Sequence, residues 1–368
     1  MNILVDMHVF DGKHQGTRTY LKGLYTELIP IAKNHHFFLV ANDVKNLKSE
    51  FKNYNNVSYI SLKSNNKFYR LLFEFPSIIK QNKIDFAHFQ YIAPPFKNCK
   101  LIITIHDILF EQKEYKKYFP FKYRIVNGAL FRWSASRANI LLTVSEYSKR
   151  KISEIYNIDL EKIKITPNAV NPIYNQTNVN SVPRNNHLGK YLLYVSRVEP
   201  RKNHLNLLRA FIQLGLVEKG YKMVFIGNKD ILFNDLKQFI NQMDSRSKAS
   251  IIWLEKVSSS ELNSYYQNCA LFVFPSFAEG FGIPPLEAMA LGKRVLCSNQ
   301  TAMNDFDLPE NFRFDPYNIE ELKRKITVQL SSNFDLAEVY KPILAKYNWQ
   351  EIAKEFKQVV DFQNKQTT

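Results

Sequence analysis

The sequence predicts an α/β protein made of two Rossmann-like domains, and three observations lead to this fold class. Short apolar runs rich in β-branched residues alternate with amphipathic segments from one end to the other, as in successive βαβ units. One polar stretch without periodicity, residues 171–190, interrupts the alternation. The length of 368 residues fits two ordinary domains better than one. We expect domains at 1–170 and 191–345, a linker at 171–190 and a final helical segment at 346–368.

The first domain is expected to contain seven strands, each a short apolar run. They are residues 3–7, 37–40, 57–60, 86–89, 101–104, 140–144 and 163–165. Helices should connect them, because parallel strands need crossover connections. Residues 19–32 carry apolar side chains at helical spacing, and a helix over 145–156 begins with Ser145, a favourable N-cap.

The second domain repeats the alternation of strands and helices. Strands are expected at 191–195, 223–226, 251–254, 271–274 and 294–297, and helices at 203–214, 235–243, 259–268, 285–291, 319–330 and 349–362. Ligands of such α/β domains bind at the carboxyl ends of the parallel strands. A ligand site is therefore expected in a cleft formed by the loops at these strand ends.

The charge balance of the chain is strongly basic. Lysine and arginine exceed aspartate and glutamate by 50 − 34 = 16. Residues 1–170 carry 26 − 14 = +12 of this excess, and residues 171–368 carry 24 − 20 = +4. Such a field attracts polyanions, so the candidate partners are nucleic acid, an anionic membrane surface and a phosphate-bearing substrate. A basic surface without a dedicated partner is an equally open interpretation.

The composition argues against several other classes of protein. With 45% hydrophobic and 23% charged residues and no low-complexity tract, the chain is typical of an ordered globular protein. It has no run of 18 apolar residues and no leader pattern at its start, so we expect a cytoplasmic protein. Its cysteines, Cys99, Cys269 and Cys297, lie far apart and indicate neither a zinc site nor a disulfide framework.

Segment 274–292 is the most informative part of the sequence. An apolar strand leads into a turn that contains Glu279, Gly280 and Gly282, and two prolines then open a helix. Glycine lets a ligand approach the backbone closely, and proline is favoured in the first turn of a helix. Free N–H groups at a helix start suit a phosphate. The segment therefore predicts a loop that binds an anionic ligand.

Two carboxylates flank the glycines of this segment. We place Glu279 in the loop and Glu287 in the first turn of the helix, where both can face one ligand. Carboxylates accept hydrogen bonds from vicinal hydroxyls, so sugars and riboses are natural ligands. Each acid also has an ordinary explanation, Glu279 as a turn residue and Glu287 as an acid that stabilises a helix start. The glycine-rich turn between them favours binding.

A second group of charges follows the strand at 191–195. Arg197, Arg201 and Lys202 cluster before the next helix, for which Asn203 is a candidate cap. Cations at the carboxyl end of a strand are well placed to hold a diphosphate. The alternative is a solvated basic loop.

The first domain offers two further candidates. Loop 10–18 contains Gly12 and Gly16 but lacks the G-x-G-x-x-G dinucleotide fingerprint, so it fits either a ligand-binding loop or a plain turn. His106 and Asp107 follow the strand at 101–104 and should lie at the edge where ligands bind. A lone histidine is more often structural, but this position favours a functional role.

These segments together resemble the retaining glycosyltransferases of family 4, which have the GT-B fold. The specific part is the E-x(7)-E motif, here Glu279 to Glu287. Supporting segments, in the family's order, are Ile105-His-Asp107, Thr143 to Lys149, Ile165 to Val170, Tyr194-Val-Ser-Arg197 and Arg201-Lys-Asn203. The resemblance spans nearly the whole chain, and 346–368 resembles the family's last helix, which crosses back to the first domain.

The resemblance implies a role for each matching residue. Glu279 would contact the transferred sugar, and Glu287 would hold the ribose hydroxyls. Arg197 and Lys202 would bind the diphosphate and stabilise the charge on the leaving nucleotide. His106 would lie beside the reacting sugar, which completes the catalytic set. The other donor-binding positions would be Gly16, Val257, Gly280, Phe281, Gly282 and Ile283.

The resemblance also implies an activity. We expect transfer of a hexose from GDP-mannose or a UDP-hexose, with retention, to a glycan or lipid-linked saccharide during biosynthesis of lipopolysaccharide, O-antigen or capsule. The family needs no metal, and no cofactor is expected. The basic first domain fits peripheral association with an anionic inner membrane. The sequence departs from the family at Ser196 and Ala169, where glycine is common, and by the single Gly16 before Thr17.

Two other classes of function were weighed. A nucleic-acid-binding protein would explain the charge and the 51 large aromatics (28 Phe, 20 Tyr, 3 Trp), but the sequence has no recognisable nucleic-acid module. A GT-B-shaped phosphorylase would need a pyridoxal lysine in a much longer chain, and an epimerase would not require the E-x(7)-E arrangement. Glycosyl transfer is therefore the favoured interpretation.

Overall fold

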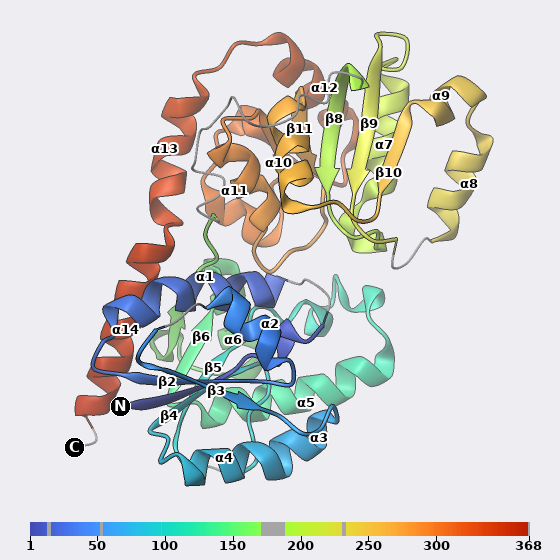
Figure 1. Cartoon of the computed structure of the whole chain (residues 1–368). Coiled ribbons are helices and arrows are strands. Elements are labelled where there is room, and N and C mark those ends of the chain that lie inside the picture. The colour runs from blue at the N-terminus through green and yellow to red at the C-terminus, as the bar shows by residue number, and fades with distance from the viewer. Residues whose placement is uncertain (13–15, 52–53, 97, 171–187, 230–232, 367–368) are drawn as a thin grey trace. The chain divides into compact units, whose positions relative to one another are not determined.

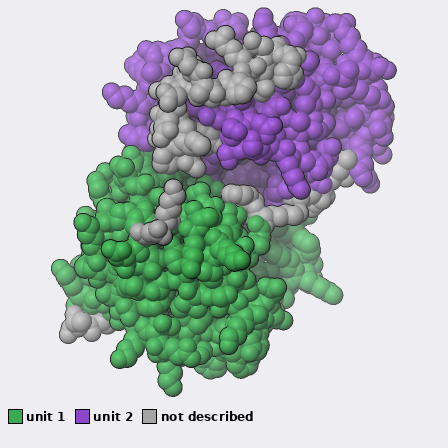
Figure 2. Space-filling model, viewed as in Figure 1, with its two compact units in different colours: residues 1–169, 347–368 green, residues 170–346 purple. Residues whose placement is uncertain are grey.

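The chain forms two compact units. The computed structural model describes residues 1–12, 16–51, 54–96, 98–170, 188–229 and 233–366. Unit 1 comprises residues 1–169 and 347–368, and unit 2 comprises residues 170–346 (Figure 2). Residues 171–187 of the expected linker lie outside the described residues. The last helix belongs to unit 1, although it follows unit 2 in sequence.

Unit 1 is built on a parallel sheet with strand order β3-β2-β1-β4-β5-β6-β7 (Figure 1). Its strands are β1 (Asn2–Asp6), β2 (His36–Ala41), β3 (Val57–Ser61), β4 (Phe86–Gln90), β5 (Lys100–Thr104), β6 (Ile140–Thr143) and β7 (Ile163–Ile165). The chain progresses outward from β1 in one direction to β3 and then from β4 in the other direction to β7. The switch point of the sheet lies between β1 and β4.

Helices cover both faces of this sheet. They are α1 (Gly16–Ile31), α2 (Val44–Glu50), α3 (Lys67–Tyr69), the π-turn η2 (Arg70–Glu74), α4 (Phe75–Gln81), α5 (Phe121–Arg137), α6 (Glu146–Tyr156) and α14 (Trp349–Lys365). Because the crossovers are right-handed, α1 and α2 lie on one face and α4, α5 and α6 on the other. Short 3-10 turns are η1 (His8–Phe10), η3 (Leu109–Glu111), η4 (Lys116–Tyr118) and η5 (Leu160–Lys162).

Helix α14 packs against α1 at very short range (Figure 1). A Cβ atom on Gly23 would lie 2.1 Å from the indole of Trp349, so only glycine leaves room for this ring. At the other end of the contact, Nε2 of His35 lies 2.8 Å from a carboxylate oxygen of Asp361. These contacts fix the final helix in unit 1.

Unit 2 is built on a second parallel sheet, with order β10-β9-β8-β11-β12-β13. Its strands are β8 (Lys190–Val195), β9 (Tyr221–Ile226), β10 (Ile251–Leu254), β11 (Leu271–Phe274), β12 (Val295–Ser298) and β13 (Arg313–Phe314). Its helices are α7 (His204–Gln213), α8 (Asn234–Gln242), α9 (Ser245–Ala249), α10 (Ser259–Asn268), α11 (Ile283–Ala290), α12 (Ile319–Ser331) and α13 (Leu336–Lys346), with 3-10 turns η8 (Pro200–Lys202), η9 (Thr301–Phe306) and η10 (Glu310–Phe312). The switch point lies between β8 and β11.

The strands expected from the sequence are confirmed, each within two residues at either end. Ser145 caps α6 as expected, since its hydroxyl accepts from the N–H of Ser148. Some elements of unit 2 were not expected, among them α9, β13 and α13. Strand β13 is only two residues long, and α13 contains Pro342, which argues against a helix in the sequence. No helix in the described part of the chain is long and apolar enough to cross a membrane.

Candidate active site

Two loops meet at the switch point of unit 2, one after β8 and one after β11. The ammonium group of Lys202 lies 2.5 Å from Oε1 of Glu279, and Nη1 of Arg201 lies 3.3 Å from Oε2 of the same carboxylate. Lys202 and Glu279 are 9% and 8% exposed. Two cations thus share one buried carboxylate where the topology of an α/β sheet leaves a ligand crevice.

The two loops are joined by hydrogen bonds that fix these side chains. The hydroxyl of Tyr194, in β8, donates to the backbone oxygen of Lys202 over 2.8 Å. The N–H of Phe277 donates to the oxygen of Arg201 over 2.9 Å, and Nη1 of Arg201 donates to the oxygen of Ala278 over 2.9 Å. The cluster is therefore preorganised by backbone contacts and does not depend on flexible side chains alone.

Asn203 plays a different part from the expected one. It stands at the N-cap position of α7, as the sequence suggested, but its side chain makes no capping bond to the helix. Instead, Nδ2 donates over 3.0 Å to the backbone oxygens of Pro275 and Pro316. Asparagine tolerates the left-handed backbone found here, with φ at 58°. The amide thus ties the loop after β8 to the loops after β11 and β13.

Burial and neighbouring charges set the protonation of the ion pair. Burial, followed by the charge of Arg201, lowers the pKa of Lys202 to about 8, while Glu279 counteracts both effects. Burial acts to raise the pKa of Glu279, but Lys202 and Arg201 outweigh it, so the pKa lies below its usual range. Both groups are charged near neutral pH. The sequence grouped Arg201 with the candidate cations, but the family resemblance gave it no role of its own; in the structure it also pairs with Glu199, with Nε 2.9 Å from Oε2.

Arg197 lies at the same strand end but does not contact Glu279 through any ion pair of the described residues. Its guanidinium is half exposed and lies 3.1 Å from Oε1 of Glu199. The turn before it is held close to β9, because a Cβ on Gly227 would lie 2.2 Å from the backbone oxygen of Ser196. Gly227 has φ at 144° and lets the backbone of Ser196 approach closely, a role that the sequence reasoning missed. The available signal was a glycine directly after a strand.

The glycine-rich loop leads into α11 earlier than expected. Gly282 has φ at 108° and stands at the N-cap, and the helix starts at Ile283 rather than at Pro285. Glu287 is therefore the fifth residue of α11, and its placement in the first turn was wrong. The two prolines carry no N–H, so Pro284 and Pro285 cannot donate to an anion at this helix start.

Glu287 is half-buried and has one hydrogen bond among the described residues. The hydroxyl of Tyr266, in α10, donates to its Oε2 over 2.8 Å. Burial raises the pKa of the Glu287 carboxyl to about 7, and the bond from Tyr266 only partly offsets this. The group is thus close to half protonated at neutral pH, and ligand hydroxyls that donate to it would favour its charged form.

This raised pKa gives a pH-dependent prediction. A carboxyl with a folded pKa above its unfolded value contributes most to stability below its ordinary pKa of 4.5, and this contribution is lost as pH rises through about 7. Glu287→Gln cannot ionise. We therefore expect the variant to melt within a degree of the wild type at pH 5 and at a higher temperature than the wild type at pH 8.

Glu320→Gln is a suitable control for this measurement, because its side chain is 75% exposed in α12. It should change the melting temperature equally at both pH values. A difference between Glu287→Gln and wild type that does not grow from pH 5 to pH 8 would contradict the prediction.

In unit 1, His106 follows β5 and is held by a buried chain of polar groups. Its Nε2 lies 2.7 Å from Oε1 of Gln90, at the end of β4, and Nε2 of Gln90 lies 3.1 Å from Nε2 of His88. Nδ1 of His88 then meets the hydroxyl of Tyr25 over 2.7 Å. Burial lowers the pKa of His106 to about 3, so its ring is neutral. Edge contact with the ring of Tyr20, at 5.0 Å, completes its packing.

The remaining predicted residues lie on loops or element starts of their own units. Gly16 is the first residue of α1, and a Cβ there would meet no atom within 4 Å. Residues 13–15 of the same loop lie outside the described residues. Val257 is half-buried shortly after β10, at the carboxyl edge that also carries Lys202 and Glu279. In the described chain, no group of three or more His, Cys, Asp or Glu side chains is arranged to hold a metal ion.

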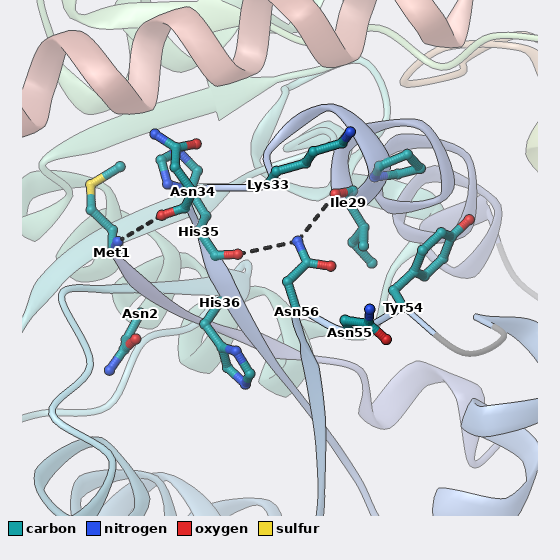
Figure 3. A pocket seen from close by; sticks show the side chains of 11 residues that line it. Met1, Asn2, Ile29, Lys33, Asn34, His35, His36, Tyr54, Asn55 and Asn56 are labelled. Carbon is teal, nitrogen blue, oxygen red and sulfur yellow. Dashed lines mark hydrogen bonds between the residues drawn. The ribbon is translucent and has the colours of Figure 1, made fainter.

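A separate pocket opens in unit 1 beside the amino ends of β1 and β2, at the edge of the sheet opposite to the one that carries His106 (Figure 3). Asn2 and His36 line it together with Asn56, whose amide donates to the backbone oxygens of Ile29 and His35. None of the predicted site residues lines this pocket. It is distinct from the candidate active site.

Comparison with known proteins defines the class to which this fold and site belong. Solved structures that superimpose on the chain include a glycosyltransferase from Rickettsia africae, with a TM-score of 0.72, 19% identity and coverage of 99% of this chain and 98% of that one. The lipopolysaccharide outer core galactosyltransferase WaaB gives 0.67 at 16% identity, covering 99% and 100%. A putative UDP-N-acetylglucosamine 2-epimerase from Listeria monocytogenes gives 0.63 at 12%, covering 100% and 97%. These likenesses establish the fold: the chain has the GT-B fold, as expected.

The particular family follows from matches to the sequence. The family model described as Glycosyltransferase Family 4 matches residues 15–173, and the one described as Glycosyl transferases group 1 matches residues 176–346. The chain belongs to this family of glycosyltransferases, and the recognition of family 4 from the sequence is confirmed.

Curated relatives include enzymes of O-antigen synthesis. The chain is 28% identical to O-antigen chain mannosyltransferase B of Escherichia coli, over 73% of this chain and 68% of that protein. It is 31% identical to O-antigen chain mannosyltransferase RfbU of Salmonella typhimurium, over 54% of this chain and 51% of that protein. The serotype-specific mannosyltransferase WbdA of Escherichia coli matches at 27% over 61% of this chain. The match spans about half of RfbU and 28% of WbdA.

Proposed function

We propose that this glycosyltransferase moves a hexose, first of all mannose, from a nucleoside diphosphate sugar to a saccharide or lipid-linked saccharide acceptor in surface polysaccharide synthesis. The observation that carries the proposal is the buried cluster of Lys202, Arg201 and Glu279 at the switch point of unit 2. The choice of mannose and of O-antigen or related polysaccharide is supported by the relatives named as O-antigen mannosyltransferases. A UDP-hexose is the second donor to test.

Unit 2 is proposed to hold the donor. Lys202 and Arg197, with Arg201 beside them, would bind the diphosphate and stabilise the negative charge that develops on the leaving nucleotide. Glu279 would accept hydrogen bonds from the transferred sugar, and Glu287 from the ribose. Backbone N–H groups at Gly280, Phe281, Gly282 and Ile283 would contact sugar and phosphate, and Val257 would lie beside the base.

Unit 1 is proposed to contribute the acceptor site and His106. The neutral imidazole would exchange a hydrogen bond with a hydroxyl of the transferred sugar, and Gly16 would allow a ligand close to the start of α1. The acceptor hydroxyl would attack the anomeric carbon on the face from which the nucleotide departs, so configuration is retained. Its proton would pass to the leaving diphosphate. The reaction as proposed requires no metal ion or cofactor.

The proposed place of action is the cytoplasm, at the inner face of the membrane. The alternatives are a nucleic-acid-binding protein and a phosphorylase or epimerase of the same fold. The fold alone does not separate transfer from epimerisation, since a putative epimerase superimposes on the chain. The E-x(7)-E arrangement favours transfer.

A donor panel tests this proposal directly. Purified full-length protein is mixed with GDP-mannose, UDP-glucose, UDP-galactose, UDP-N-acetylglucosamine, dTDP-glucose and ADP-glucose, and melting temperature and donor hydrolysis are measured. One nucleotide class should raise the melting temperature. At a concentration of 100 times its Kd, the donor should add about 2.7 kcal/mol to the free energy of unfolding. Hydrolysis should persist in EDTA, and the sugar should first be released with its donor configuration. No shift with any donor, combined with salt-dependent DNA binding at physiological ionic strength, would overturn the proposal.

A further inference from the structure

Unit 1 exposes apolar side chains in an unusual concentration. The described chain has thirteen exposed large hydrophobic side chains, and eight of them fall within segments 68–73 and 121–126. We call these eight the exposed apolar set: Phe68, Tyr69, Leu72, Phe73, Phe121, Tyr123, Ile125 and Val126, which are 39% to 68% exposed. Scattered apolar side chains on a surface are ordinary, but a gathering of this kind marks an interaction site.

The two segments belong to the same side of unit 1. Segment 68–73 lies in the continuous helix formed by α3, η2 and α4, which connects β3 to β4, and segment 121–126 begins α5, which connects β5 to β6. Both helices lie on one face of the sheet (Figure 1), and Leu71, Phe75 and Phe131 on their inner sides belong to one core cluster. The first helix ends just before β4 begins, and α5 ends just before β6 begins. Because strands of a parallel sheet begin at its amino edge, both helices start at the carboxyl edge. The exposed apolar set therefore lies toward that edge.

The set occupies the outward stripes of these helices. On α5, Phe121 and Ile125 are four residues apart, as are Lys122 and Val126, and all four are exposed. The opposite face of α5 is buried through Phe131 and other small or apolar residues. In the other helix, the rings of Tyr69 and Phe73 contact each other with centroids 5.3 Å apart. A surface helix normally turns polar residues outward, so both helices are apolar on a face that the described chain does not cover.

Basic residues surround the exposed apolar set. Segments 63–74 and 113–126 contain 3 + 5 = 8 lysines and arginines against 1 + 1 = 2 glutamates. One of these acids, Glu74, already accepts from the backbone N–H groups of Lys63 and Ser64. Six of the cations are exposed lysines: Lys63, Lys67, Lys113, Lys116, Lys117 and Lys122. The surface is therefore both apolar and strongly positive.

We propose that this surface docks unit 1 on an anionic lipid bilayer. Aromatic and aliphatic side chains on a helix lying in the membrane plane bury themselves at the boundary of headgroups and acyl chains. Flexible lysines beside them reach the anionic headgroups, and their long stems can cover apolar surface. A protein partner of ordinary composition offers no such density of negative charge around an apolar layer. The inference adds a lipid partner to the proposed function but does not require that the enzyme be a mannosyltransferase.

Vesicle sedimentation of the full-length protein tests the proposal. Vesicles of phosphatidylcholine with 30% phosphatidylglycerol should retain the protein at 50 mM salt, and vesicles of phosphatidylcholine alone should retain much less. Lys116→Gln with Lys117→Gln should lower the partition coefficient on anionic vesicles about 10- to 30-fold, since each lysine near the surface contributes about fivefold. Phe121→Ser with Ile125→Ser should lower it by at least about 10-fold, and the binding that remains should be more sensitive to salt.

Matched controls come from exposed aromatics outside the set. Phe362→Ser in α14 and Tyr317→Ser in unit 2 remove side chains that are 63% and 55% exposed and should leave vesicle binding unchanged. Equal loss in these controls, or no retention of wild type by anionic vesicles, would overturn the proposal. So would a dimer that dissociates in Phe121→Ser with Ile125→Ser, because the set would then be a contact between copies. Donor hydrolysis measured without vesicles should be unchanged in the docking variants, which separates this test from that of the catalytic proposal.

Discussion

Lys202→Ala and Glu279→Ala are each expected to lower kcat by about 100- to 1000-fold, the loss seen when a preorganised charge at a transition state is removed. Lys202 is the buried cation that would stabilise the leaving diphosphate, and Glu279 is the carboxylate that pairs with this cation and would accept a hydrogen bond from the sugar. Steady-state kinetics with the donor identified by the panel measures the effect.

Lys202→Ala and Glu279→Ala should each lower the free energy of unfolding, and the double variant should recover part of the loss. Breaking a buried ion pair from one side leaves the other charge without its partner and costs about 3–5 kcal/mol. In Glu279→Ala, Lys202 loses its paired carboxylate and stays beside Arg201, with only the weaker effect of Glu199 in its favour, so its pKa should fall below the value of about 8 that it has with Glu279 present. Removing both partners together restores compensation, so the double variant should be more stable than either single variant.

The double variant separates a structural role from a catalytic one. If the pair merely holds two loops together, Lys202→Ala with Glu279→Ala should recover activity along with stability. If the pair acts on the substrate, stability should recover while kcat stays at least about 100-fold below wild type. The surface pair Glu320 and Lys323, 2.7 Å apart in α12, is the control, and its removal should cost less than about 1 kcal/mol and no activity.

The sequence alone predicted the sheets well, because apolar strand cores have a strong local signature. Strands β10 and β11 and helix α10 begin and end at the expected residues. The strand, loop and helix around E-x(7)-E could also be predicted, since they follow one another locally. The start of α11 was missed by two residues because prolines suit several positions of a first helical turn.

The contacts inside the site could not be predicted in the same way. Lys202 and Glu279 are 77 residues apart in the chain, and their pairing arises from the sheet order that brings β8 beside β11. Arg201 pairs with Glu279 while Arg197 pairs with Glu199, and this difference follows from side-chain direction within one short turn, which no periodicity encodes. Gly227 matters because of a single backbone oxygen, that of Ser196, at a distance set by tertiary structure.

His106→Ala is expected to lower kcat/KM by about 10- to 100-fold, because the sugar would lose a hydrogen bond in a site shielded from water. The hydrogen bonds around His106 determine which ring nitrogen carries the proton. With Nε2 of Gln90 toward His88 and Oε1 toward His106, the ring nitrogen Nε2 of His106 must donate, which leaves Nδ1 as the acceptor. A neutral ring with Nδ1 unprotonated can accept from a sugar hydroxyl.

Gln90→Glu tests this arrangement through pH. A carboxylate in place of the amide oxygen would stabilise the imidazolium, so the pKa of His106 should rise from about 3 toward neutrality. Below that new pKa the ring carries a second proton and Nδ1 can no longer accept, so kcat/KM should fall as pH is lowered from 8 to 5. The wild type should show no fall in kcat/KM caused by His106 between pH 8 and 5, because its ring stays neutral throughout this range.

Nitrogen NMR of the imidazole provides a readout that does not depend on turnover. In the wild type the ring should show one protonated nitrogen, Nε2, between pH 5 and 8, and in Gln90→Glu it should titrate. Gln90→Leu leaves Nε2 without an acceptor, so kcat/KM should fall at every pH without a new titration. A parallel loss in both variants with an unchanged pH profile would show that Gln90 only fills space, whatever His106 does in the reaction.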